Sequence, residues 1–310
     1  MPVYDALGYG VYHLDAQYVE PGVASIYAVI EDGEVAFFET GTANSLPFVQ
    51  QFLDELSIDV RQVRYVVPTH VHLDHAGGAG VMMQTFPDAQ LVIHPRGARH
   101  MIDPSRLVAA SKAVYGEETF NRLYGQIPSI DEGRVIVADH EFRFSLGKRE
   151  FLVLDTPGHA YHHFCVVDEQ SQGIFTGDTF GLSYPNLSYH GDRFIIPTTT
   201  PTHFNPQAMH QSIDLLMSYH PQRMYLTHFN MLPDPASHVD QYHDWVDRFV
   251  AITEQIKPDA EDGVSKLVSS LGQMLQQGFE LDDESIHHQL AMDINLNAQG
   301  LAFWYQHRDG

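Results

Sequence analysis

Cysteine is almost absent from this sequence: Cys165 is the only one among 310 residues. A single thiol cannot form an internal disulfide, so nothing points to an oxidising compartment. No stretch approaches the roughly 20 consecutive apolar residues of a membrane-spanning helix. The first ten residues also lack the basic and apolar segments of a secretion signal. We therefore expect a cytoplasmic protein that is not bound to a membrane.

Basic residues are also scarce. The 17 lysines and arginines face 40 aspartates and glutamates, which gives a formal charge of −23. Such a field repels phosphate backbones, so we expect a small-molecule substrate and no nucleic-acid partner. Hydrophobic residues make up 44% of the chain, which favours a packed globular interior over disorder.

Short apolar runs alternate with helical segments over the first 230 residues. An Asp-Gly pair at 32–33 between two such runs predicts a β-hairpin. Helices are expected at 45–56, with Pro47 in the first turn, and after Asn205 as N-cap with Pro206 at the first position. Together these patterns predict an α/β fold. The expected strands are 23–30, 35–40, 63–68, 90–94, 151–156, 163–167, 173–177 and 224–227.

The pattern becomes helical from about residue 237. Ser237 and Asp240 have the spacing of a capping box, and Trp245, Phe249 and Ile252 recur at helical intervals. Further helices are expected near 262–278, 284–292 and 297–307. We therefore predict a catalytic domain over 1–236 and a helical extension over 237–310 packed on it.

The strongest chemical signal is the segment 69–75, Thr-His-Val-His-Leu-Asp-His, directly after an apolar strand that ends at Pro68. His70 and His72 are two residues apart, so on an extended backbone they share a face. Asp74 and His75 then diverge toward a second position. Imidazole and carboxylate ligands suit zinc, iron or manganese. A polar loop with chance histidines is the alternative.

Three further residues follow predicted strands: His159 in TPGHA, Asp178 in TGDTF and His228 in LTHF. Taken singly, each is more typical of a cap or a turn. Together, they place a metal-competent residue after each of four strands. If those strands are neighbours, their carboxyl ends converge on one edge, where α/β proteins usually bind ligands.

The HxHxDH run, the PGH, the GD and the later TH, in this order, resemble the metallo-β-lactamase superfamily, most closely its glyoxalase II-like branch. The resemblance covers roughly residues 23–230. It implies a four-layer αββα sandwich with metals at the sheet edge, here followed by the helical C-terminal extension.

The resemblance also implies a ligand set for two divalent metal ions, zinc first, with iron or manganese as alternatives. One ion would be held by His70, His72 and His159. The other would be held by Asp74, His75 and His228, with Asp178 bridging both. A hydroxide shared by the two ions would attack a carbonyl or phosphoryl centre. Asp74 is the expected catalytic residue, because it is placed to orient this nucleophile.

Several positions depart from relatives. Glu39 stands where many members have aspartate and is the expected carboxylate behind the ligands. Position 72 is histidine, where flavodiiron oxygen reductases have glutamate. Gly181 replaces the catalytic tyrosine of lactonases, although Tyr184 or Tyr189 could reach in. The bridging position is Asp178 rather than cysteine, which argues against a true zinc β-lactamase.

Two long insertions, 95–130 and 181–205, are expected to act as lids or substrate walls. The competing interpretation is that their aromatics are core packing and the threonines at 198–200 a surface loop. His163 is either a support for the ligands or a packing residue. The aromatic segment 303–305 could bury against a second subunit in a homodimer.

The leading hypothesis is a dinuclear hydrolase acting on a small ester, thioester or lactone-like substrate. The second is an iron oxidoreductase on the same fold, either persulfide-dioxygenase-like or an oxygen-binding diiron protein, because nitrogen and oxygen ligands accept iron. A sensor that binds without turnover ranks last, since no ligand is missing.

Overall fold

The structure is a computed structural model that describes residues 3–187, 193–259 and 262–308. The chain folds into two compact units that interleave along the sequence. The first comprises Met1–Asp155, His162–Gly177 and Arg223–Pro233. The second comprises Thr156–Tyr161, Asp178–Gln222 and Asp234–Gly310. The predicted boundary at 236/237 stays a prediction, because these units group the C-terminal helices with residues 178–222.

The first unit contains a seven-stranded sheet in the order β1-β2-β3-β4-β5-β6-β7. Strands β1 to β4 pair antiparallel, and β4 to β7 pair parallel. The predicted Asp-Gly hairpin joins β3 to β4, with Asp32 at φ 49° and Gly33 at φ 82°. The strands are β1 (Tyr4–Gly8), β2 (Val11–Asp15), β3 (Ser25–Glu31), β4 (Glu34–Phe38), β5 (Val63–Val67), β6 (Gln90–Ile93) and β7 (Val135–Val137).

A second sheet has the order β13-β12-β11-β10-β9-β8. All the predicted strands are confirmed, and β1, β2, β7, β8 and β13 are additional. The members of this sheet are β8 (Arg143–Leu146), β9 (Arg149–Asp155), β10 (Phe164–Asp168), β11 (Gly173–Leu182), β12 (Arg223–His228) and β13 (Asn230–Pro233). Cys165 is buried in β10, and its thiol donates to the Thr176 carbonyl at 3.3 Å.

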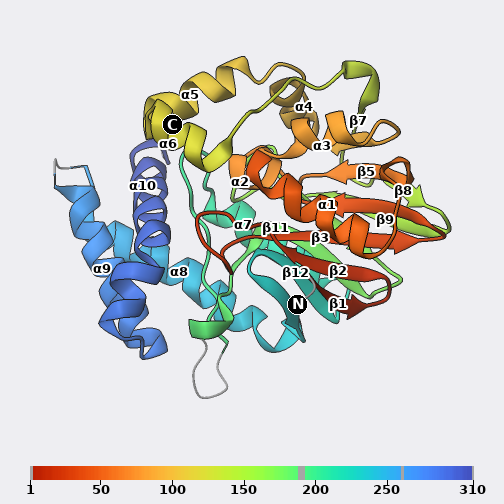
Figure 1. Cartoon of the computed structure of the whole chain (residues 1–310). Helices are drawn as coiled ribbons and strands as arrows, with labels where there is room; N and C mark the ends of the chain where they lie inside the picture. The colour runs from red at the N-terminus through yellow and green to blue at the C-terminus, as the bar shows by residue number, and fades with distance from the viewer. Residues whose placement is uncertain (1–2, 188–192, 260–261, 309–310) are drawn as a thin grey trace. The chain divides into compact units, whose positions relative to one another are not determined.

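The first unit buries two apolar cores. One lies between the sheets, where the Phe38 and Phe175 rings stack with centroids 3.8 Å apart. The other lies between the seven-stranded sheet and helices that cover it (Figure 1). Each buried phenylalanine contributes about 1.5–3 kcal/mol. These helices are α1 (Leu46–Glu55), α2 (Leu73–Ala76), α3 (Ala79–Thr85), α4 (Pro95–Ile102), α5 (Ser105–Tyr115) and α6 (Glu117–Tyr124).

The second unit is helical, apart from the end of β11. As predicted, α7 begins at Pro206, and the Asn205 side chain caps it by accepting from the Ala208 amide at 3.0 Å. Trp245 of α8 stacks on Phe279 of α9 with centroids 4.7 Å apart. Its elements are α7 (Pro206–Met217), α8 (Val239–Ile256), α9 (Gly263–Phe279), a π-helical turn (Ser285–Gln289) and α10 (Ala291–His307).

Two local predictions in this region are wrong. The Ser237–Asp240 capping box does not form, because Ser237 closes a short turn by donating to the Asp234 carbonyl. The helix α8 begins instead after His238. The helix expected at 297–307 is longer, because it starts at Ala291, and the segment before it forms a π-helical turn.

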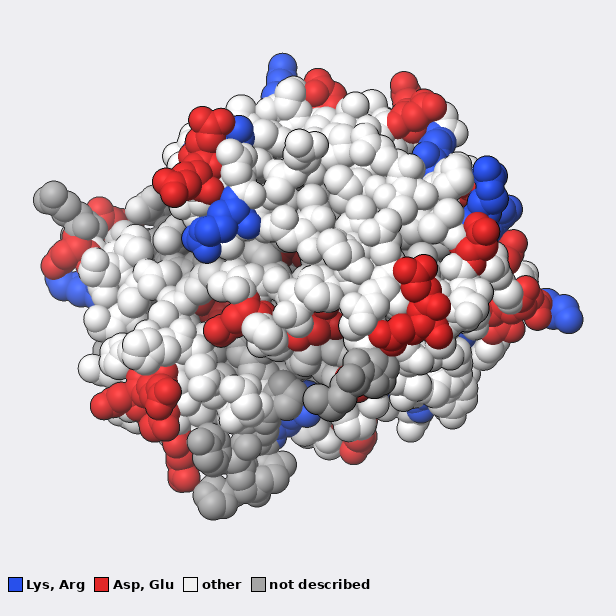
Figure 2. Space-filling view, viewed as in Figure 1, with Lys and Arg blue, Asp and Glu red and all other residues white. Residues whose placement is uncertain are grey.

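Two features of the structure concern association with membranes and the distribution of surface charge. Within the described residues, no helix combines the length and apolar character needed to cross a membrane. On the face drawn in Figure 2, acidic and basic side chains are scattered rather than gathered into one patch of either sign.

Candidate metal centre

The first pair of predicted ligands leaves the end of β5. His70 and His72 lie in the loop between β5 and α2, and their ring nitrogens face each other, with His70 Nε2 2.8 Å from His72 Nδ1. The other nitrogen of His70, Nδ1, lies 3.1 Å from the Thr69 hydroxyl. Two imidazoles that converge in this way offer adjacent donor atoms to a metal ion.

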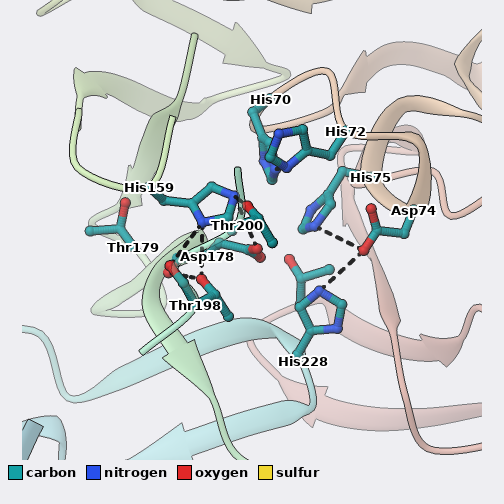
Figure 3. Close-up of polar contacts among 12 residues, drawn as sticks. His70, His72, Asp74, His75, His159, Asp178, Thr179, Thr198, Thr200 and His228 are labelled. Atoms are coloured by element: carbon teal, nitrogen blue, oxygen red, sulfur yellow. Dashed lines mark hydrogen bonds and ion pairs between the residues drawn. The ribbon is translucent and has the colours of Figure 1, made fainter. Parts of the chain in front are cut away.

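A second set of ligands gathers around Asp74 in the same unit. Its Oδ2 lies 3.5 Å from His75 Nε2 and 3.3 Å from His228 Nε2 (Figure 3). The α2 helix supplies Asp74 and His75, and His228 is the last residue of β12. One ligand atom from each residue lies within 4.8 Å of the others. The structure therefore brings these three predicted residues together.

Hydrogen bonds fix which ring nitrogens face Asp74. The Nδ1 atom of His75 lies 3.1 Å from the Glu39 carboxylate, and Nδ1 of His228 lies 2.8 Å from the Val23 carbonyl. Both partners can only accept, so each Nδ1 carries a proton, and in the neutral form of each ring Nε2 presents a lone pair. Two lone pairs and a carboxylate oxygen thus face one point. This donor set fits a divalent cation, whose charge would offset their mutual repulsion.

Charge around Asp74 agrees with that role. Burial opposes ionisation, but the attraction and hydrogen bonds of His75 and His228 in their charged form, with a proton on Nε2 as well as on Nδ1, outweigh it and hold the pKa of the Asp74 carboxyl well below its usual range. The group is therefore an anion at neutral pH, suited to bind a cation or accept a hydrogen bond.

Glu39, which follows β4, organises this region of the first unit. Its buried carboxylate accepts from the Thr69 hydroxyl at 2.5 Å, the Thr69 amide at 3.1 Å and the Thr227 hydroxyl at 3.0 Å, besides His75. Its backbone has φ 64°, which is unfavourable for a residue with a Cβ. The expectation of a supporting glutamate is confirmed, and Thr69 and Thr227 are partners that no sequence pattern indicated.

The second unit holds the other two predicted ligands. His159 Nε2 lies 3.3 Å from Asp178 Oδ2. His159 Nδ1 lies 3.1 Å from both the carbonyl and the hydroxyl of Thr198, and that hydroxyl donates to the Asp178 carbonyl at 3.2 Å (Figure 3). The proton of His159 therefore sits on Nδ1, and its Nε2 lone pair points toward the carboxylate.

The C-terminal helix α10 anchors Thr199, the residue next to the threonine that contacts His159. The Asn297 side chain accepts from the Thr199 amide at 2.6 Å, and the Thr199 hydroxyl donates to the main-chain carbonyl of Asn297 at 3.0 Å. A Cβ on Gly300 would overlap the Thr199 carbonyl, so only glycine permits this approach. The expectation that the threonines form a surface loop is wrong, because Thr198 and Thr199 are buried.

Asp178 was expected just after a strand but lies inside β11, which continues to Leu182. The strand bends at Gly177, where φ is 49° and a Cβ would overlap Thr69 and His163. His163 itself is buried against His70, with ring centroids 4.9 Å apart. The glycine therefore allows β11 to pass the ligand loop closely.

The insertion at 181–205 is largely packed where the structure describes it, whereas most residues of the insertion at 95–130 are partly or fully exposed. Tyr184 and Phe194 are buried, and Phe194 contacts Phe279 with centroids 4.7 Å apart, as the packing interpretation predicts. Tyr189 lies outside the described residues. Motion of these segments as lids stays a prediction, as does the homodimer.

A sequence model of the metallo-beta-lactamase superfamily matches residues 19–228. The match covers more than half of the chain, so the protein belongs to this superfamily. Its α/β fold and its two sheets agree with that assignment, and the fold implies divalent metal binding. Membership of the glyoxalase II-like branch stays a prediction.

Individual relatives are distant. The chain is 27% identical over 197 residues to the metallo-beta-lactamase fold-containing protein ST1585 of Sulfurisphaera tokodaii, covering 62% of this chain and 68% of the relative. It is 25% identical over 162 residues to the acyl-coenzyme A thioesterase MBLAC2 of Gallus gallus, covering 45% of this chain and 56% of that protein.

Solved structures show the same fold. The crystal structure of ST1585 gives a TM-score of 0.63 at 20% identity, covering 94% of this chain and 98% of that one. A structure described as a peroxy diiron species of the chemotaxis sensor ODP gives 0.56 at 13% identity, covering 79% of this chain and 93% of that one. At these identities the likeness concerns the fold alone.

Proposed function

We propose that the protein is a dinuclear metal-dependent hydrolase acting on a small ester, thioester or lactone-like substrate. The observation that carries the proposal is the meeting of three acceptor atoms, Asp74 Oδ2, His75 Nε2 and His228 Nε2. The Nδ1 protons of the two histidines are donated to the Glu39 carboxylate and to the Val23 carbonyl. Such a cluster is suited to a cation.

In this proposal the ligands of both units share one centre. His70, His72 and His159 would hold one ion, and Asp74, His75 and His228 would hold the other, with Asp178 as a ligand of both. Chain connectivity supports the assignment, because Asp178 follows Gly177 of the first unit within one strand. When bound, the two ions would activate water near neutral pH and stabilise a developing oxyanion.

The chain's own residues divide the remaining work. Asp74, an anion at neutral pH, accepts a hydrogen bond from the attacking water and so orients it. Glu39 keeps the proton of His75 on Nδ1, and Thr198 does the same for His159. Both contacts leave Nε2 as the ligand atom.

The substrate class rests on the relatives. An acyl-coenzyme A thioesterase and fungal atrochrysone carboxyl ACP thioesterases are among the proteins similar to this chain. These relatives favour a thioester over an ester or a lactone as the substrate. Purified protein loaded separately with zinc, manganese or iron should hydrolyse members of a panel of acyl-coenzyme A thioesters, aryl esters and lactones.

Substitution tests the ligand assignment. We expect His72→Ala and Asp178→Ala to lower kcat/KM at least about 100-fold, since removing one ligand disturbs both metal affinity and geometry. His220→Ala, which removes an exposed imidazole of the second unit, is the matched control. Hydrolysis that persists unchanged in both ligand variants would refute the proposal.

A second candidate is an iron oxidoreductase on the same fold. It is favoured by the all-nitrogen-and-oxygen ligand set, which accepts iron, and by the fold shared with the diiron chemotaxis sensor. Metal analysis and visible absorption of protein expressed without added zinc separate the two. Iron as the main metal, with oxygen-dependent spectral change and no hydrolysis, would favour this second function.

A further inference from the structure

Two histidines and two aspartates of the second unit form a cluster away from the seven proposed ligands. Helix α7 carries His210 and Asp214, and helix α8, which contacts it, carries His243 and Asp247. Both helices thus present a His-x-x-x-Asp pair, whose members lie one turn apart on the same face. None of these four residues has a part in the proposed hydrolysis.

The contacts cross between the helices. His210 Nε2 lies 3.1 Å from the Asp247 carboxylate, and His243 Nε2 lies 3.3 Å from that of Asp214. The remaining ring nitrogens face each other, with Nδ1 of His210 2.6 Å from Nδ1 of His243. In each imidazole, Nε2 therefore contacts a carboxylate, and Nδ1 faces Nδ1 of the other histidine.

The proton count at this contact follows from the partners. A carboxylate can only accept, so both Nε2 atoms carry protons. Two bare Nδ1 lone pairs would repel at 2.6 Å, so the contact requires one more proton, shared between them.

A metal ion fits the place of that shared proton. Imidazole ligands of metals usually donate their second N–H to a carboxylate or carbonyl, which orients the ring. The same convergence of imidazole nitrogens occurs at His70 and His72, where the distance is 2.8 Å. Zinc-to-nitrogen bonds of about 2.0–2.1 Å need a nitrogen separation of about 3.3 Å, so modest ring rotation would suffice.

We propose that His210 and His243 form a second, separate binding site for a borderline divalent ion such as Zn²⁺ or Cu²⁺. Their Nδ1 atoms are the ligands, Asp247 and Asp214 position the rings, and water completes the coordination. The side chains are 27% and 23% exposed, which leaves room for that water. The ion replaces the shared proton, so one proton leaves as one ion binds.

Copper is the sharpest probe, because Cu²⁺ binds nitrogen sites most tightly among these ions. The 310-residue chain, with its resident metals quantified, is titrated with Cu²⁺ and followed by electron paramagnetic resonance. The spectrum should show nitrogen ligation. A lightly buffered titration should release about one proton per ion at neutral pH.

Variants decide the assignment. We expect His210→Ala and His243→Ala to raise the Kd for Cu²⁺ at least about tenfold, and Asp247→Asn to raise it about tenfold while nitrogen ligation remains. His220→Ala should leave the Kd unchanged. If either histidine variant unfolds, His210→Gln and His243→Gln, of similar length, replace it.

Two results would overturn the site. One is a Kd within twofold of the parent in both histidine variants. The other is a copper spectrum without nitrogen ligation in the parent protein. Because the catalytic ligands are intact in all these variants, failure here leaves the proposed hydrolase untouched, and loss of hydrolysis elsewhere leaves this site untouched.

Discussion

The two units hold their metal-competent histidines in different ways. In the first unit, His75 donates to the buried carboxylate of Glu39, which also accepts three further hydrogen bonds. In the second, His159 donates to the neutral carbonyl and hydroxyl of Thr198. A charged carboxylate therefore orients the imidazole of His75, whereas neutral dipoles orient that of His159.

This contrast has energetic consequences. Hydrogen bonds to an ionised acceptor are roughly twice as strong as neutral ones. The Glu39 network also connects β4, the ligand loop and β12 within a single sheet-based unit. The Thr198 contact depends instead on a threonine run that Asn297 and Gly300 of α10 hold in place. The first arrangement rests on a charged network within the first unit, whereas the second depends on a helix that contacts Thr199 from 98 residues further along the chain.

The largest effect is expected where α10 meets that run. Gly300→Ala places a methyl group on the Thr199 carbonyl, so either the helix or the threonine run must move. We expect a loss of about 3 kcal/mol or more in unfolding free energy and weaker zinc binding, measured by denaturant unfolding and metal titration.

Gly272→Ala in α9 is the matched control. Its Cβ would lie at an ordinary 3.4 Å from Ile286, and helix propensity favours alanine by up to about 1 kcal/mol. Equal stability of both variants would show that α10 does not constrain the threonine run.

Glu39→Gln probes the charged network. All four contacts of Glu39 come from donors, so one donor must face the new NH₂ group inside the protein. We expect a loss of about 2–3 kcal/mol and about 10–100-fold weaker metal binding. The exposed pair of Glu34 and Arg64 supplies the control Glu34→Gln, expected to cost under about 1 kcal/mol. A zinc affinity unchanged in Glu39→Gln would deny the carboxylate its orienting role.

Thr198→Val should have a smaller effect. The valine loses the hydroxyl, but the carbonyl at position 198 still accepts from His159. We expect about 1 kcal/mol or less and under about tenfold in zinc affinity. Thr199→Val loses the hydroxyl contacts to Asn297 but keeps the amide contact that holds the threonine run, so it should reduce stability without this change in affinity. If Thr198→Val lost as much zinc affinity and stability as Glu39→Gln, the charge of Glu39 would give no advantage over a neutral acceptor in orienting the imidazole.

Sequence predicts the first unit well because its signals are local. Strand runs, the Asp-Gly turn and the ligand-rich segment each lie within a few consecutive residues, and every predicted strand forms. Even Glu39 was expected, because it stands at the position of a known carboxylate. Its partner Thr227 was not, since it is 188 residues away along the chain.

The second unit is harder to predict for the same reason. The run at 197–201 has no helical or strand period, and its burial depends on Gly300 far along the chain. The Ser237 capping box failed because a turn stabilised by Asp234 competes for the same hydroxyl. The bend at Gly177, which continues β11 past Asp178, likewise depends on Thr69 and His163.

Ionisation of Tyr18, a buried tyrosine of the first unit, provides a further test. Tyr18 and Tyr124 share a buried hydroxyl contact of 3.1 Å. Burial, reinforced by the Asp74 carboxylate, raises the pKa of Tyr18 above its usual 10.0. The folded protein therefore keeps this proton at alkaline pH while the unfolded chain loses it, so stability is full below pH 10 and falls as pH rises above it.

Tyr18→Phe should cost about 1 kcal/mol at neutral pH but make the decline above pH 10 shallower by about 1.4 kcal/mol per pH unit. Urea unfolding at several pH values measures the slope, with Tyr219→Phe as an exposed control. An unchanged slope would mean that Tyr18 ionises alike in both states.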